Sequence, residues 1–226
     1  FTGSAAHMRK LADALAQRGY TVRTINLPGH AATEEDMGRQ TWQTWLQACK
    51  EASLEMMGEV KTFTIGGLSM GGVLSLLVAE QMKVNGCVPI SAPMGVMNKM
   101  LPLAGLAAPF VKRIPWGEQP DRSRQLDPAY DFGYTGFPTA KGSDLFKLIK
   151  LAKRNLFNIN CPILCVQSDG DDTVTPSSAD EILAGVSSDH KEKLWLHGVP
   201  HVCTISRELP AIVDAVDALM KTAAAS

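Results

Sequence analysis

The stretch FTIGGLSMGG, at residues 63–72, constrains the fold more than any other part of the sequence. A β-prone run, KTFTI, leads into Gly67-Leu68-Ser69-Met70-Gly71, and the apolar residues that follow have the spacing of a buried helix. A strand and a helix can meet across so short a turn only where the residues beside the serine lack bulk. The sequence therefore predicts a strand at 61–65, a tight turn at Ser69 and a helix that begins at Gly71.

Strand and helix patterns alternate along most of the rest of the chain. Further strands are predicted at 21–27, 86–90, 162–167 and 192–196, and helices before Gly19, over 41–57 and over 205–220. Such alternation predicts an α/β fold, with a mostly parallel sheet and helices on both of its faces.

Residues 94–155 do not fit this alternation. They hold two segments with helical apolar spacing around a polar, turn-rich piece. An insertion this long between two strands is more typical of a cap or lid than of a structureless loop. We therefore expect a core made of residues 1–93 and 156–226, with 94–155 as an inserted cap.

Composition excludes several classes of function. The chain has 22 basic and 23 acidic residues, which gives no electrostatic basis for binding nucleic acid or an anionic membrane. No apolar run approaches the ~18 residues of a membrane span, and no secretory signal is visible, so we expect no stable membrane insertion. The five cysteines lack the spacing of a disulfide framework. They predict reduced thiols in a cytoplasmic protein.

The serine has the surroundings of a nucleophile. A G-x-S-x-G pentapeptide between a strand and a helix is a nucleophile elbow, which exposes the serine Oγ above the sheet. The start of the helix offers the N–H of Met70 to a developing oxyanion. The alternative is a glycine-rich turn with an incidental serine, which the flanking strand and helix make less favourable.

A serine hydroxyl also needs a base and an orienting carboxylate. The acids Asp169, Asp171 and Asp172 follow the strand predicted at 162–167, and the histidines His197 and His201 follow the one at 192–196. The alternative is that the aspartates belong to a solvated turn and that His201 is a surface loop histidine. The remaining histidines, His7, His30 and His190, are predicted to be helix, turn and surface residues, and no pair of them has metal-ligand spacing, so we expect no metal.

Three motifs carry a resemblance to a known family. GLSMGG, the DDTVTP turn and PHV resemble the bacterial carboxylesterases and monoacylglycerol lipases of the α/β-hydrolase superfamily. The opening FTGSAAHMRKLADALAQRGY is similar to the segment that follows His-Gly in that family's oxyanion loop. The resemblance extends from Phe1 to the last helix and is weakest across 94–155. It implies that His201 is the base, that Asp171 is the acid with Asp172 as runner-up, and that Phe1 supplies the second oxyanion N–H.

The resemblance implies a serine carboxylic-ester hydrolase that acts through an acyl-enzyme, without a cofactor, on short- to medium-chain acyl esters or monoacylglycerols. The apolar stretch 96–111 would line an acyl pocket, or else pack as an ordinary cap helix; the residues expected there include Met97, Leu101, Leu106 and Phe110. An amide or peptide hydrolase, or a thioesterase, could use the same triad. A non-catalytic binding protein on this scaffold would be expected to lack one triad residue.

Two departures from the family pattern lie near the oxyanion loop. The turn has Gly29-His30-Ala31 where the family often has Gly-His-Gly, and no His-Gly precedes Phe1. An oxyanion hole of this type needs a second backbone donor from the loop after the fold's third strand. We therefore expect roughly 20 upstream residues that end in His-Gly and supply a central strand of ~5–6 residues.

Overall fold

The computed structural model describes residues 1–95, 104–116 and 125–225. Four parallel strands form the main sheet, in the order β1 (Thr64–Leu68), β2 (Gly86–Ile90), β5 (Ile163–Ser168) and β6 (Lys191–Leu196). These strands confirm the ones predicted at 86–90, 162–167 and 192–196. β1 begins three residues later than predicted, and it extends to Leu68 because Gly66 and Gly67 are themselves extended and pair with β2. A separate antiparallel pair joins β3 (Arg113–Pro115) to β4 (Gly136–Pro138).

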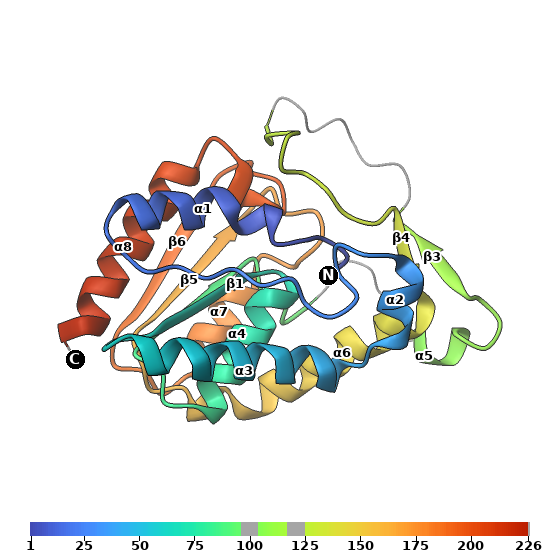
Figure 1. Ribbon diagram of the computed structural model, residues 1–226, viewed down its shortest axis with the longest axis horizontal. Helices are drawn as coiled ribbons and strands as arrows, with labels where there is room; N and C mark the ends of the chain where they lie inside the picture. Colours follow the sequence, from blue (N-terminus) through green and yellow to red (C-terminus); the bar gives the residue numbers. More distant parts are fainter. Residues whose placement is uncertain (96–103, 117–124, 226) are drawn as a thin grey trace.

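Helices cover both faces of the sheet, as the alternation predicted (Figure 1). α1 (Ala6–Gln17) and α8 (Leu209–Ala225) pack on one face. On the other lie α3 (Trp42–Glu59), α4 (Met70–Gln81), α6 (Thr139–Asn155) and α7 (Ser178–Gly185). The remaining short elements are α2 (Glu34–Arg39), α5 (Ala104–Ala107), η2 (Leu156–Asn158) and η3 (Cys203–Ile205). No helix among the described residues is long and apolar enough to cross a bilayer.

Local signals set the ends of the first helices. Gly19, with φ +92, lies just past α1, where a left-handed residue ends a helix at little steric cost. Thr41 and Thr44 form a reciprocal capping box at the start of α3. The last helix begins at Leu209 rather than at 205, and this places Pro210 in its first turn, where its missing N–H has no intrahelical partner to lose.

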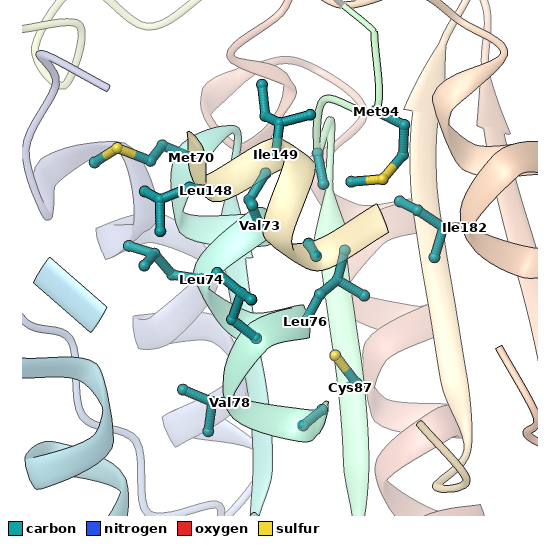
Figure 2. Packing of buried hydrophobic residues seen from close by; sticks show 14 of the residues in the cluster. Met70, Val73, Leu74, Leu76, Val78, Cys87, Met94, Leu148, Ile149 and Ile182 are labelled. Atoms are coloured by element: carbon teal, nitrogen blue, oxygen red, sulfur yellow. The ribbon is translucent and has the colours of Figure 1, made fainter. Parts of the chain in front are cut away.

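The core is built around α4, which is apolar on nearly every side and is buried on nearly every side. Figure 2 shows Leu148 and Ile149 of α6 lying over α4 near Val73. α6 falls within the 94–155 insertion, yet it belongs to the helical layer that covers the sheet. The division into core and cap stays a prediction.

The strand predicted at 21–27 does not form, and that prediction is wrong for the structure described. Residues 21–26 are exposed and lie in no sheet. A strand needs a partner about 4.7–4.9 Å away, and among the described strands β1 pairs only with β2. A cavity of about 730 Å³ has both residues 21–27 and β1 among its lining residues. The expectation of an upstream strand stays a prediction.

Glu80, near the end of α4, provides a test of burial. Neither of its carboxylate oxygens has a hydrogen-bond partner in the described part of the chain, and burial raises the pKa of Glu80 to about 8. An unfolded glutamate ionises near 4.5, so the folded protein holds this proton more tightly. The protonated Glu80 carboxyl contributes its full stability below pH 4.5. This contribution decreases above pH 4.5 and is lost as the pH rises through about 8.

We therefore expect Glu80→Gln to raise the melting temperature above that of the wild type in mildly alkaline buffer, with a difference that shrinks as the pH falls toward 4.5. Thermal unfolding followed by circular dichroism measures this. Glu51→Gln, at an exposed position on α3, is the control and should leave the pH dependence unchanged. A Glu80→Gln effect of equal size at every pH would contradict the ionisation argument.

Candidate active site

Ser69 is the single residue between β1 and α4. Its backbone has φ 58 and ψ −120, a combination that residues other than glycine rarely adopt and that is typical of strained functional positions. Its N–H donates to the carbonyl of Ile90 at 2.8 Å, which fixes the turn against the end of β2. The turn has the geometry of the nucleophile elbow expected from the sequence.

The glycines around Ser69 have different roles. A Cβ on Gly67 would lie 2.4 Å from the carbonyl carbon and oxygen of Gly71, and a Cβ on Gly72 would lie 2.7 Å from the Cβ of Ala92. A Cβ on Gly71 would meet nothing within 4 Å. The close approach of strand and helix therefore depends on Gly67 and Gly72, although the pentapeptide motif singles out Gly67 and Gly71.

Asp171 and His201 lie side by side at the carboxyl ends of β5 and β6. His201 Nδ1 is 2.8 Å from Asp171 Oδ2, and both side chains are buried. The other carboxylate oxygen, Oδ1, accepts the backbone N–H groups of Thr173 and Val174, each at 2.9 Å. Since the carboxylate occupies Nδ1, the Nε2 atom of His201 is the one left for proton transfer.

The same two loops hold a second acid–histidine pair. His197 Nδ1 lies 2.8 Å from Asp169 Oδ2, but the His197 side chain is 80% exposed. Asp172 is also exposed and accepts from the hydroxyl of Thr173 at 3.2 Å. Of the alternatives that the sequence left open, only Asp171 and His201 form a buried pair.

The electrostatics of Asp171 suit an acid that stays ionised. Burial by itself would raise the pKa of Asp171. The hydrogen bonds from His201, Val174 and Thr173 outweigh burial and leave the pKa of Asp171 below its ordinary value. The carboxylate is therefore charged at neutral pH and can orient the imidazole.

Ser69, Met70, His201 and Phe1 line one cavity, the one that also borders β1. Met70 is the first residue of α4 and is buried. The Phe1 ring makes edge contacts with Trp45, Trp116 and Phe137, with ring centres 6.3, 6.1 and 5.0 Å apart.

Of the residues expected to line an acyl pocket, the two that the structure describes do not line this cavity. Met97 and Leu101 lie outside the described residues. Leu106 and Phe110 are 77% and 87% exposed, and neither is among the residues that line the cavity. The described apolar lining comes from other elements, and it includes Met8, Leu27, Ile65, Leu68 and Leu74.

Sequence analysis missed several residues at the site. His7, on α1, and His30, in the turn after residues 21–27, also line the cavity. Gln167 is fully buried and its amide donates to Asp171 Oδ2 at 3.2 Å; a lone polar residue in the apolar run PILCVQ was the available signal. Thr2 has a positive φ of 63, which no local sequence pattern indicates.

Comparison with known proteins places this site in a family. The family model described as "Serine aminopeptidase, S33" matches residues 1–208. A thermostable monoacylglycerol lipase of Bacillus sp. (strain H-257) is 34% identical over 224 residues, covering 95% of this chain and 84% of that protein. A carboxylesterase of Bacillus subtilis (strain 168) is 28% identical over 209 residues, covering 92% and 84%.

A solved structure from work on LipS and LipT, two metagenome-derived lipolytic enzymes, matches with a TM-score of 0.91 at 28% identity. The match covers 98% of this chain and 90% of that one. The chain belongs to the serine aminopeptidase S33 family and has the α/β-hydrolase fold. It is a serine ester hydrolase, and the family and class of enzyme predicted from the sequence are confirmed.

The glycine geometry gives a first prediction for the site. Gly67→Ala should destabilise the protein and abolish esterase activity, because its Cβ would overlap the backbone of Gly71. Gly71→Ala should keep the stability of the wild type, because its Cβ has open space. Denaturant unfolding and an esterase assay compare the two variants. Equal loss of stability in both variants would contradict the argument that the contact between Gly67 and the backbone of Gly71 excludes a side chain at position 67.

A second prediction separates the three aspartates. Asp171→Asn should lower kcat by about 10⁴-fold, because the amide no longer holds His201 in the tautomer that leaves Nε2 free to act as base. Asp172→Asn and Asp169→Asn should stay within a few-fold of the wild type, because the carboxylate that accepts from His201 Nδ1 is that of Asp171. Steady-state measurement of kcat for the three variants on one ester tests this assignment. A severe loss in Asp172→Asn would move the acid by one residue.

Proposed function

We propose that this protein hydrolyses esters of short- to medium-chain acids, among them monoacylglycerols, with Ser69, His201 and Asp171 as its catalytic triad. The observation that carries the proposal is the buried Asp171–His201 pair beside the same cavity as the strained Ser69. The name of the Bacillus monoacylglycerol lipase supports that substrate class.

The reaction follows from the roles of these atoms. Ser69 Oγ attacks the ester carbonyl carbon while His201 Nε2 takes the hydroxyl proton. The tetrahedral oxyanion accepts hydrogen bonds from the N–H groups of Met70 and Phe1. The alcohol leaves when its C–O bond breaks and His201 returns the proton to the alcohol oxygen. Water then attacks the acyl-enzyme by the same route, so the proposed mechanism uses no cofactor or metal.

The description of the matched family keeps the peptide alternative open. An amide or peptide hydrolase, or a thioesterase, could use the same three residues, because the fold does not fix the substrate. Aminoacyl p-nitroanilides and acyl thioesters, assayed beside the esters, distinguish these activities. A non-catalytic binding protein is disfavoured because all three triad positions are filled.

The proposed substrate is a small ester, and we propose a cytoplasmic location for the enzyme. All five cysteines are free, although three of them are buried. Free thiols are usual in reducing compartments.

The experiment that tests this function is hydrolysis of p-nitrophenyl esters from acetate to palmitate. Ser69→Ala should lose on the order of 10⁶ in kcat, because the members of such a triad act as a unit. A phosphonate inhibitor should label Ser69 and no other serine. Ser75→Ala, on the helix α4 that follows Ser69, is the control and should keep its activity. Labelling at Ser75 or Ser91, or an active Ser69→Ala enzyme, would contradict the proposal.

A further inference from the structure

Thr2, the residue after Phe1, has a strained backbone. Its φ is 63 and its side chain is buried. For a β-branched residue a positive φ is a true outlier, and such strain persists only where the surrounding structure enforces it. Rotation about the Thr2 φ bond moves Phe1 relative to the rest of the chain. The conformation of Thr2 therefore sets the direction of the Phe1 backbone.

Two residues of the 94–155 insertion hold Thr2 directly. The indole N–H of Trp116 donates to Thr2 Oγ1 at 3.0 Å, and the backbone N–H of Tyr134 donates to the Thr2 carbonyl at 3.0 Å. Trp116 follows β3, and Tyr134 lies two residues before β4. The backbone N–H of Trp116 donates to the carbonyl of Thr135 at 3.0 Å. Trp116 and Tyr134, the two residues that donate to Thr2, therefore lie at the same end of the β3–β4 pair.

Neighbouring contacts leave this loop little room to relax. A Cβ on Gly133 would lie 3.1 Å from the Thr2 carbonyl oxygen, which shows how closely the insertion approaches the loop. The hydroxyl of Tyr134 donates to the Gly29 carbonyl at 2.8 Å and accepts the N–H of Ala32 at 2.9 Å. The insertion thus bonds both to the loop at Thr2 and to the turn that carries His30.

We propose that Trp116 and Tyr134 are positioning residues, which keep Thr2 at its positive φ so that the backbone N–H of Phe1 points at the oxyanion. The inference rests on the function proposed above and adds a role for the insertion in the chemical step, separate from substrate selection. The plainer interpretation is that these bonds only satisfy buried polar groups. If Trp116 and Tyr134 position Phe1, loss of one of these hydrogen bonds lowers kcat. If the bonds only satisfy buried polar groups, kcat stays unchanged.

Trp116→Phe tests the proposal, because it removes the indole donor and keeps a smaller aromatic ring at the position that packs against Phe1. We expect kcat for p-nitrophenyl acetate to fall about 10- to 100-fold with KM unchanged, since full loss of an oxyanion donor costs about 10²–10³. Affinity for a trifluoromethyl ketone, which forms a tetrahedral adduct with the serine, should fall by a similar factor. The melting temperature should change little.

Substitution of Thr2 in the Trp116→Phe background makes the test specific. Thr2→Gly should recover most of the lost kcat, because glycine adopts a positive φ at no steric cost. Thr2→Ala should not recover it, because alanine keeps the strain. Trp195→Phe removes an indole on β6, which is not part of this contact, and should behave as the wild type. An unchanged kcat in Trp116→Phe, or equal recovery by Thr2→Ala and Thr2→Gly, overturns the proposal.

Hydrogen exchange tests whether Trp116 holds Thr2 in place, without a measurement of activity. Peptides that contain Phe1, Thr2 and Gly3 should exchange faster in Trp116→Phe than in the wild type, and unchanged exchange overturns the proposal. If the wild type neither hydrolyses esters nor is labelled at Ser69, it is the proposed function that fails. The exchange measurement still decides whether Trp116 holds the loop.

Discussion

The close contact between β1 and α4 at Ser69 is the constraint on which the rest of the site depends. Strand and helix approach until a single added carbon on Gly67 would overlap the backbone of Gly71. The turn is completed by one residue, Ser69, which takes a strained conformation and is fixed by its N–H to Ile90. The same geometry places Met70 at the start of a buried helix, where its N–H can meet an anion.

The parallel sheet brings the partners of Ser69 to the same edge. β1, β5 and β6 all end at this edge, so the residues that follow them in sequence become neighbours in space. Two aspartate–histidine pairs form there with similar geometry, and they differ in burial. Asp169 and His197 bond in solvent, while Asp171 and His201 bond in an enclosed environment with backbone N–H groups on the carboxylate. Only the second pair can orient an imidazole with little competition from water.

The described parts of residues 94–155 contact the rest of the protein at several places. α6 packs against α4, and an Arg113–Glu34 ion pair joins β3 to α2. The segments around β3 and β4 reach the loop at Thr2 and the turn at Gly29. The part of the chain with the weakest family resemblance therefore contacts loops beside the cavity that holds Ser69.

The sequence alone determined the strand–turn–helix at Ser69, the alternation of strands and helices, and the short set of acids and histidines that could serve the serine. These features depend on residues close together in the chain, where spacing and glycine placement are decisive. Tertiary structure decided the rest. Residues 21–27 have strand-forming side chains but pair with none of the described strands, and Leu106 and Phe110 are apolar yet exposed. The pairing of Asp171 with His201, and the positive φ of Thr2, depend on hydrogen bonds between residues 30 or more positions apart, which no local pattern records.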